Sequence, residues 1–186
     1  MNWMLLKYFQ QIIFTGARRF FVLAFLLSGL PFLSACTADP ESTQDPNSQS
    51  IHSALVIKVK DGDSLILRYA QGIEKEVRLF GIDAPEYNQA FGQDAKHILE
   101  NLTLKKTVLV QKHTTDRYQR EVVLLIRVQD DLNINLAMLE QGAAWVYRQY
   151  QNEPSWARLE KRAKSQQQGL WAGARPVAPW EWRKSQ

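Results

Sequence analysis

Three short polar stretches, residues 61–64, 78–86 and 116–120, each lie beside an expected turn or strand end. Their most informative side chains are three carboxylates and two guanidinium groups, from Asp63, Arg78, Asp83, Glu86 and Arg120. Carboxylates bind hard divalent cations and orient water, and arginines neutralise a phosphate that becomes more negative in the transition state. Metal-assisted cleavage of a phosphodiester requires this combination, so the sequence predicts a nuclease.

Each of these residues could also be purely structural. Asp63 beside Gly62 fits an ordinary turn, and Asp83 shortly before Pro85 fits a turn or helix-capping carboxylate. The two arginines could pair with neighbouring glutamates in solvent. We favour the functional interpretation because all five side chains would have to be structural at once.

Short strands and helices would position these side chains. Alternating apolar residues bounded by turn signals predict five strands, at residues 54–60, 64–69, 74–80, 107–112 and 121–128. Apolar residues at helical spacing predict helices at residues 89–102, 135–141 and 154–168. This order predicts an α+β fold that is mainly β, a five-stranded OB-fold-type Greek-key barrel with about three helices. We expect the C-terminal tryptophans to pack against the barrel, namely Trp171, Trp180 and Trp182.

The first 35 residues have the character of an export signal. They carry three basic residues and no acidic residue, and their apolar run from Phe20 to Phe32 is interrupted only by Ser28. This run is shorter than the about 20 residues that a membrane-spanning helix needs, so we predict a secretory signal peptide. The sequence Leu-Ser-Ala-Cys at residues 33–36 resembles the lipobox of bacterial lipoproteins, which implies lipidation of Cys36.

Two alternatives to lipidation stay open for this segment, ordinary cleavage near Ala38 and an uncleaved anchor that includes the first 14 residues. Lipidation is favoured because Cys36 is the sole cysteine, which also leaves it no partner for an intramolecular disulfide. An acylated Cys36 would hold the chain on a membrane. We therefore expect an exported protein, lipid-anchored to the cell envelope on its periplasmic or cell-surface side.

The rest of the chain divides into a tether and one domain. Residues 36–52 are rich in Ser, Thr, Pro, Asp, Asn and Gln, and they predict a flexible tether because they have little apolar surface to bury. Residues 53–186 are enough for a single core. This domain holds 20 of the 23 basic and 16 of the 19 acidic residues. Its mildly basic charge suits a polyanionic substrate without identifying one.

Taken in order, the three polar stretches resemble the staphylococcal nuclease (thermonuclease) family. The resemblance covers nearly all of residues 54–173, including Asn-Leu-Ala-Met-Leu-Glu-Gln-Gly at 135–142 and Gly-Leu-Trp at 169–171. Each motif alone is weak, since Asp-Gly-Asp also marks ordinary hairpins, but their order and spacing together are specific. The resemblance implies an OB-fold barrel, dependence on Ca²⁺, and hydrolysis of DNA and RNA that leaves 3′-phosphates.

The resemblance also implies roles for the acidic residues. Asp63 and Asp83 would supply carboxylate oxygens to Ca²⁺, the backbone carbonyl of Ala84 would be a third ligand, and water would complete the shell. A site with so few protein ligands is expected to bind Ca²⁺ loosely. Glu86 resembles the carboxylate that positions the attacking water and acts as general base.

By the same resemblance, arginines and tyrosines would bind the nucleic acid. Arg78 would contact the scissile phosphate from within the barrel, and Arg120 would contact it from the facing loop. Arginine suits this role because a guanidinium group binds phosphate through two hydrogen bonds. Tyr118, Tyr147 and Tyr150 match the tyrosines that line the nucleotide pocket of the family. Stacking on tyrosine accepts any base, which implies broad sequence tolerance.

The chain departs from the family pattern at Gln119 and in the loop after Glu86. Gln119 stands where the family usually has Gly. If this turn needs a positive φ, Gln would cost on the order of 1 kcal/mol or would redirect Arg120. The loop from Tyr87 to Phe91 is short compared with the mobile loop of the founding nuclease, so we expect a smaller lid contribution to substrate capture.

We therefore predict an exported, monomeric, Ca²⁺-dependent endonuclease that acts on DNA and RNA outside the cytoplasm. The alternative is a catalytically inactive OB-type module that binds nucleic acid at the cell envelope, which Gln119 favours mildly and the three carboxylates oppose. A structural lipoprotein that uses the barrel only for protein contacts is a third hypothesis, and the charged constellation opposes it.

Overall fold

The computed structural model describes residues 51–150 and 153–186. The predicted signal peptide, Cys36 and the predicted tether up to residue 50 lie outside the described residues. The first strand begins at Ile51, so it includes the last two residues of the segment predicted as a tether. Among the helices of the described residues, none is long and apolar enough to cross a membrane.

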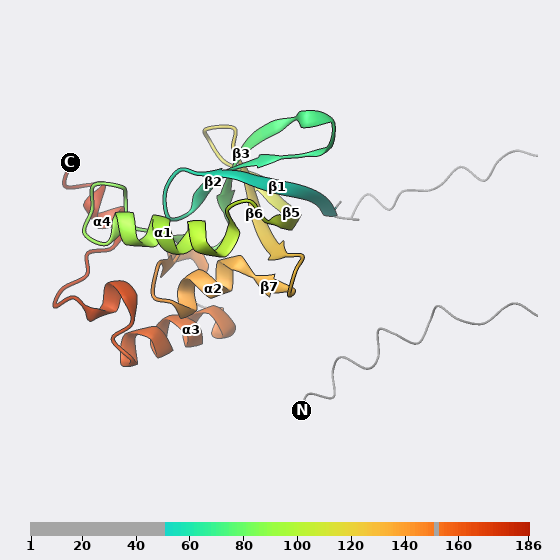
Figure 1. The fold of residues 1–186 in the computed structure, drawn as a ribbon. Helices are drawn as coiled ribbons and strands as arrows, with labels where there is room; N and C mark the ends of the chain where they lie inside the picture. The colour runs from blue at the N-terminus through green and yellow to red at the C-terminus, as the bar shows by residue number, and fades with distance from the viewer. Residues whose placement is uncertain (1–50, 151–152) are drawn as a thin grey trace, which may run out of the picture. The chain divides into compact units, whose positions relative to one another are not determined.

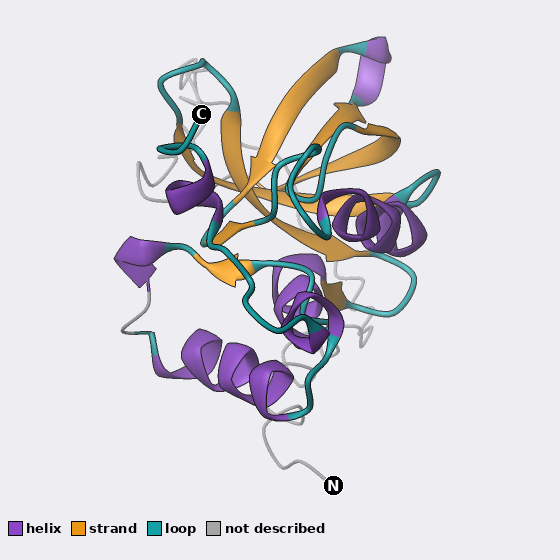
Figure 2. Ribbon diagram, turned by 90° about the vertical axis from the view of Figure 1, so that its left-hand side faces the viewer, coloured by secondary structure: helices purple, strands orange, loops and turns teal. Residues whose placement is uncertain are grey.

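A closed five-stranded barrel forms the centre of the described domain (Figures 1 and 2). Its strands are β1 (Ile51–Val59), β2 (Ser64–Arg68), β3 (Glu74–Leu79), β5 (Thr107–Thr115) and β6 (Glu121–Arg127). Antiparallel pairing runs in the order β3-β2-β1-β5-β6, and a parallel pairing of β3 with β6 closes the barrel. The predicted OB-fold-type barrel is confirmed.

Alternation along the strands creates the barrel core. Val77 and Leu79 of β3, and Val123 and Leu125 of β6, are at most 1% exposed, while the residues between them face outward or the barrel end. Each fully buried aliphatic side chain of this kind contributes about 1.5–3 kcal/mol relative to an exposed one. Barrel closure therefore depends on the period-2 pattern visible in the sequence.

Three helices match the predicted ones: α1 (Gly92–Thr103), α2 (Ile134–Glu140) and α3 (Pro154–Ser165). In Figure 1 they lie to one side of the barrel, with α2 packed against α1, α3 and β6. The Asn133 side chain accepts a hydrogen bond from the backbone N–H of Leu136 and caps α2. α1 begins at Gly92 rather than at residue 89, because residues 87–91 form turns that return the chain to the barrel.

Several short elements were not predicted. The two-residue strands are β4 (Ile82–Asp83), β7 (Leu132–Asn133) and β8 (Trp145–Val146), and β4 pairs with β8. The single-turn helices are η1 (Ala70–Gly72), η2 (Arg148–Tyr150), η3 (Gly169–Ala172) and α4 (Pro179–Trp182). Elements this short have no periodic pattern that sequence analysis can recognise.

The C-terminal segment folds back beside the barrel. The rings of Trp171 and Trp180 pack against Trp145, with ring centroids 4.2 Å and 5.8 Å away. The side-chain amide of Gln89 donates a hydrogen bond of 2.6 Å to the carbonyl of Val177. The predicted packing of these two tryptophans is thus found, but on β8 rather than on the barrel strands.

Candidate active site

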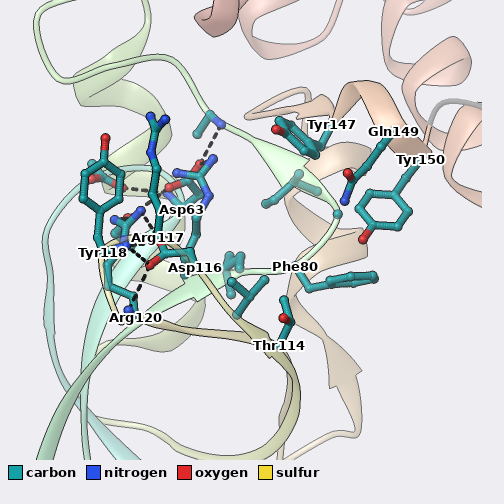
Figure 3. A pocket seen from close by; sticks show the side chains of 18 of the residues that line it. Asp63, Phe80, Thr114, Asp116, Arg117, Tyr118, Arg120, Tyr147, Gln149 and Tyr150 are labelled. Atoms are coloured by element: carbon teal, nitrogen blue, oxygen red, sulfur yellow. Dashed lines mark hydrogen bonds and ion pairs between the residues drawn. The ribbon is translucent and has the colours of Figure 1, made fainter.

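One open cavity of about 640 Å³ collects most of the predicted site residues (Figure 3). It lies where the start of β2, the end of β3, the loop after β4 and the β5–β6 hairpin meet. Eight of the nine predicted residues line it, namely Asp63, Arg78, Ala84, Glu86, Tyr118, Arg120, Tyr147 and Tyr150. Asp83 does not line it, because its side chain is only 1% exposed and lies behind the cavity wall.

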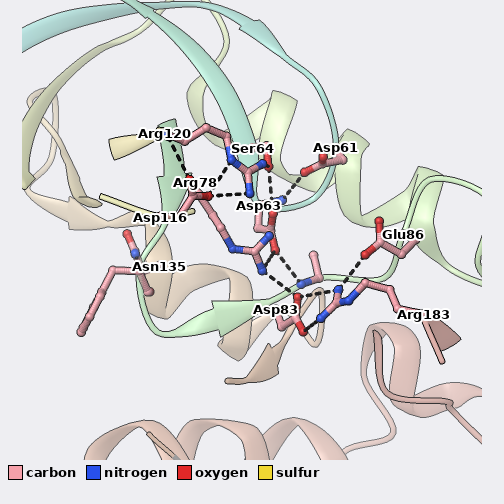
Figure 4. Close-up of polar contacts among 12 residues, drawn as sticks. Asp61, Asp63, Ser64, Arg78, Asp83, Glu86, Asp116, Arg120, Asn135 and Arg183 are labelled. Atoms are coloured by element: carbon pink, nitrogen blue, oxygen red, sulfur yellow. Dashed lines mark hydrogen bonds and ion pairs between the residues drawn. The ribbon is translucent and has the colours of Figure 1, made fainter. Parts of the chain in front are cut away.

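Asp63 and Asp83 meet at a single arginine (Figure 4). Nη2 of Arg78 lies 2.9 Å from Oδ2 of Asp63 and 2.7 Å from Oδ1 of Asp83. Arg78 projects from β3, Asp83 lies in β4, and Asp63 directly precedes β2. Two carboxylates that share one nitrogen are close enough to share one cation.

Local hydrogen bonds hold Asp63 in position. The backbone N–H of Asp63 donates to Oδ1 of Asp61 at 3.0 Å, an arrangement that stabilises the turn before β2. The carboxylate of Asp63 accepts hydrogen bonds from the Ser64 hydroxyl at 3.0 Å and from the Ala84 backbone N–H at 3.1 Å. The peptide of Ala84 therefore lies beside the carboxylate, while the predicted role of its carbonyl stays a prediction.

Burial dominates the electrostatics of this carboxylate. Burial raises the pKa of Asp63 to about 6, even though the charge of Arg78 opposes the shift. In turn, the charge of Asp63 raises the pKa of Arg78 above its ordinary value. The charge of Arg78 and the hydrogen bonds from Ala84 and Ser64 thus favour the charged form of this carboxylate against burial, and a bound cation would act in the same direction.

Glu86 lies on a loop that packs tightly against the start of α1. The backbone N–H of Glu86 donates to the side-chain oxygen of Gln89 at 3.1 Å, and its carbonyl accepts from the Gln89 backbone N–H at 2.9 Å. A Cβ atom on Gly92 would lie 1.9 Å from the carbonyl oxygen of Glu86, so only glycine permits this approach. The side chain of Glu86 reaches the cavity and is 39% exposed.

Asp116 anchors Arg120 in the β5–β6 hairpin. Oδ1 of Asp116 accepts the backbone N–H groups of Tyr118 (2.8 Å) and Arg120 (2.9 Å), and Oδ2 accepts Nε of Arg120 at 2.8 Å. Nη1 of Arg120 then reaches the hydroxyl of Ser64 at 3.2 Å, next to Asp63. These hydrogen bonds hold the pKa of Asp116 below its ordinary value, although burial acts in the opposite direction.

The positive φ anticipated for Gln119 is present, with φ at 64°. Arg120 nevertheless lines the cavity, so the hairpin accepts a strained glutamine without moving the arginine away. The sequence allowed two consequences of Gln119, backbone strain or a redirected Arg120, and this geometry matches backbone strain.

The three predicted tyrosines occupy two sides of the cavity (Figure 3). Tyr118 is 65% exposed, and the guanidinium of Arg120 lies 5.5 Å from its ring centroid. On the other side the ring centroids of Tyr147 and Tyr150 are 6.4 Å apart, and Tyr150 contacts Phe80 at 4.6 Å. Both sides therefore present aromatic faces to a chain lying across the cavity.

Sequence analysis missed two polar residues of this site. Asp116 carries a weak signal, since it stands four residues before Arg120 in the same polar hairpin. Arg183, which follows α4, carries no sequence signal, because it is 100 residues from Asp83 in the chain. In the structure it contacts both Asp83 and Glu86 (Figure 4).

The donor set suits a hard cation with few protein ligands. The available groups are carboxylate oxygens, which Ca²⁺ prefers, and the two nearest already converge on one positive nitrogen. Within residues 51–150 and 153–186, no three His, Cys, Asp or Glu side chains gather into a metal site. A cation here would therefore take most of its ligands from water or substrate.

Sequence comparisons relate the chain to known proteins. A family model described as staphylococcal nuclease homologue matches residues 76–173. A Haemophilus influenzae protein named uncharacterized endonuclease is 35% identical over 165 residues, which cover 89% of this chain and 85% of that protein. A Shigella flexneri protein named micrococcal nuclease is 38% identical over 141 residues, covering 70% of this chain and 79% of that protein. An Escherichia coli protein named uncharacterized endonuclease is 38% identical over 128 residues, which cover 69% of this chain and 82% of that protein.

Proposed function

Because the chain belongs to the staphylococcal nuclease family, we propose that it is a Ca²⁺-dependent endonuclease that hydrolyses DNA and RNA and leaves 3′-phosphates. One observation carries the proposal. Asp63, Arg78, Glu86 and Arg120, from four separate segments, line one cavity, with Asp83 directly behind Arg78. A module that only bound nucleic acid would gain nothing from the carboxylates of Asp63 and Glu86 lining a cavity for a polyanion.

Asp63, Asp83 and the backbone carbonyl of Ala84 are the proposed ligands of Ca²⁺. When bound, Ca²⁺ would neutralise charge on the phosphate and help to orient it. The buried Asp63 and Asp83, at 4% and 0% exposure, are held rigidly by the contacts described above, which favours a preorganised site.

Glu86 is the proposed general base. It would accept a proton from the water that attacks phosphorus, while Arg78 from β3 and Arg120 from the β5–β6 hairpin would donate hydrogen bonds to the phosphate oxygens. The bond between phosphorus and the 5′ oxygen then breaks, the 5′ oxygen takes up a proton from water, and the phosphate stays on the 3′ side. The hydrogen bonds from Asp116 would keep the Arg120 guanidinium oriented during this step.

The substrate would lie between Tyr118 on one side and Tyr147 with Tyr150 on the other. These rings can stack on bases without distinguishing among them. We therefore propose cleavage with little sequence preference, and binding that weakens with salt.

The proposed location is outside the cytoplasm, with the chain exported by its signal peptide, held at the cell envelope by lipid on Cys36, and monomeric. The pattern of residues 1–36 supports the export and the lipid anchor, and the monomeric state is the default expectation for a single domain. Metabolic labelling with a radioactive fatty acid tests it. Label in the wild-type chain that Cys36→Ser abolishes is the expected result, and an unlabelled or cytoplasmic wild-type chain contradicts it.

Cleavage of single-stranded and duplex DNA by the purified full-length chain, with Ca²⁺ or with EGTA, tests the activity. We expect Ca²⁺-dependent cleavage that Glu86→Gln and Arg120→Ala each reduce by about 10²–10³-fold, because each removes a group that acts on the transition state. Arg68→Ala is the matched control, since Arg68 pairs with Glu74 at the surface and does not line the cavity.

Two results would contradict the assignment. Salt-sensitive DNA binding without cleavage in any divalent metal would instead establish the inactive binding module. Cleavage that Arg120→Ala leaves unchanged would remove Arg120 from the site.

A further inference from the structure

Arg183 makes the closest contacts of any basic residue to Glu86 in the described chain, and it also covers Asp83 (Figure 4). Its Nη2 lies 2.7 Å from Oδ2 of Asp83, and its Nη1 lies 3.2 Å from Oδ1 of Asp83 and 2.6 Å from Oε1 of Glu86. This guanidinium therefore bridges one proposed metal ligand and the proposed general base.

The contacts satisfy both oxygens of Asp83. Oδ1 accepts from Arg78 and Arg183, and Oδ2 accepts from Arg183. With 0% exposure, Asp83 has no water to balance its charge, so it needs cations beside it. Arg183 is the cation on the side of Oδ2 and Glu86, and its own side chain is 41% exposed.

The segment that carries Arg183 is docked by contacts of its own. Val177 accepts the hydrogen bond from Gln89, and the Trp180 ring lies against Trp145 and 5.8 Å from the Arg148 guanidinium. These anchors come before Arg183 in the chain, while residues 184–186 are exposed. The Arg183 side chain can therefore leave Asp83 without undoing the anchors.

A divalent cation at Asp63 and Asp83 would meet Arg183 at short range. Two positive charges a few ångströms apart repel strongly at a partly buried site. Both the metal and Arg183 would also draw on the same Asp83 oxygens. Arg183 and the metal thus oppose each other's binding.

We propose that Arg183 is an internal cation that competes with Ca²⁺ for Asp83 and holds Glu86 at the same time, and so closes the active site when the metal is scarce. The inference rests on the proposed function, because it takes Asp83 as a metal ligand. Arg183 lies beyond residues 76–173, the range that the family model matches. Arg183 pairs with Asp83 and Glu86 in the metal-free protein, and swings into solvent when Ca²⁺ binds.

Calcium affinity of the full-length chain, measured by isothermal titration calorimetry, tests the competition directly. Arg183→Ala is expected to bind Ca²⁺ on the order of tenfold more tightly than wild type, because a positive charge beside the site is removed. Deletion of residues 183–186 should have the same effect. Lys184→Ala is the matched control and should leave the affinity unchanged, because Lys184 pairs only with the exposed Glu181 among the described ion pairs.

Thermal unfolding gives a second readout. Without metal, Arg183→Ala should lower Tm, because Asp83 loses two hydrogen bonds. At saturating Ca²⁺ the difference from wild type should disappear.

The outcomes separate this inference from the proposed function. If wild type binds Ca²⁺ and cleaves DNA but Arg183→Ala has equal or weaker affinity, the competition is wrong and the nuclease stands. Unchanged affinity with lost cleavage would overturn it too, and would make Arg183 a phosphate-binding residue. If neither protein binds Ca²⁺ nor cleaves DNA, both the proposed function and the competition are wrong.

Discussion

At the scale of single residues, the candidate site is a set of buried carboxylates balanced by arginines from different segments. Asp63 and Asp83 share Nη2 of Arg78, and Asp83 also holds Arg183. Removing one partner of such a buried pair leaves an uncompensated charge, which costs far more than the net contribution of the pair. The balance of charge, more than any single contact, keeps these side chains in place.

Gln119, one of the non-glycine residues with positive φ, offers a measurement of backbone strain at the site. Its φ of 64° favours glycine, so Gln119→Gly is expected to raise the free energy of unfolding by about 0.5–1 kcal/mol. Activity should be kept, because Asp116 rather than Gln119 holds Arg120. Urea denaturation and DNA cleavage are the measurements.

A second glutamine provides the control for Gln119. Gln166 caps the end of α3 with φ of −89°, where glycine relieves no strain, so Gln166→Gly should not raise the free energy of unfolding. Equal destabilisation by both substitutions would show that the hairpin carries no strain at Gln119.

At the scale of elements, the site depends on how closely the loop carrying Glu86 packs against α1. Hydrogen bonds between Glu86 and Gln89 shape the loop, and the missing side chain of Gly92 lets the Glu86 carbonyl approach the helix start. The second element is the β5–β6 hairpin, in which Asp116 sets the direction of Arg120. Each element brings one catalytic candidate to the cavity.

Gly92→Ala tests the role of this packing. The added methyl group would overlap the Glu86 carbonyl, so the loop must move. We expect at least about tenfold lower kcat, because catalytic groups displaced by about 1 Å lose much of their effect, and a stability loss of about 1–3 kcal/mol. Steady-state kinetics and thermal unfolding measure the two effects.

Gly173→Ala is the control for Gly92→Ala. A Cβ atom at Gly173 would meet only the Leu170 carbonyl at 3.6 Å, an ordinary contact, so both kcat and Tm should stay close to wild type. A wild-type kcat in Gly92→Ala would mean that the position of the loop does not limit catalysis.

At the scale of the whole molecule, polar cross-links reinforce the closure of the barrel. Glu121, at the start of β6, accepts hydrogen bonds from Lys75 of β3 at 2.7 Å and from the Tyr69 hydroxyl at 3.4 Å. The buried side chain of Asn135 in α2 accepts from Leu125 and donates to the carbonyls of Phe80 and Val123. These residues connect strands and helix at the seam where β3 meets β6.

The seam predicts a pH dependence of stability. Burial alone would raise the pKa of Glu121, but the hydrogen bond and charge of Lys75 outweigh it and hold this pKa below the ordinary 4.5. A lowered pKa in the folded state means that the stabilisation is present above pH 4.5 and is lost as the pH falls through the lower folded value. Glu121→Gln should therefore cost about 0.5–1 kcal/mol at pH 7 and progressively less toward pH 3.

Urea denaturation between pH 3 and pH 7 measures this effect. Glu74→Gln is the control, because Glu74 pairs with Arg68 where both side chains are nearly half exposed, and its effect should be small at every pH. A cost of Glu121→Gln that does not change with pH would show that packing, not charge, accounts for it.

The five barrel strands and their succession along the chain follow from the sequence, because period-2 alternation and turn residues act over a few positions along the chain. The barrel was inferred from that succession and the family from the polar motifs, whereas the pairing order of the strands comes from the structure. The same local signals located Asp63, Arg78, Asp83, Glu86 and Arg120, since residue type and spacing are themselves sequence properties. The positive φ at Gln119 was also accessible, as the consequence of a turn that usually holds glycine.

Only the tertiary structure decided which charges meet. Arg78 contacts Asp63 and Asp83 because β2, β3 and β4 come together at one end of the barrel, and Arg183 reaches Asp83 because Trp180 and Val177 dock the C-terminal segment. Two-residue strands and single-turn helices are likewise stabilised by packing rather than by local propensity. Ion pairs across 100 residues leave no periodic trace, because their energy depends on distance in space and not on separation along the chain.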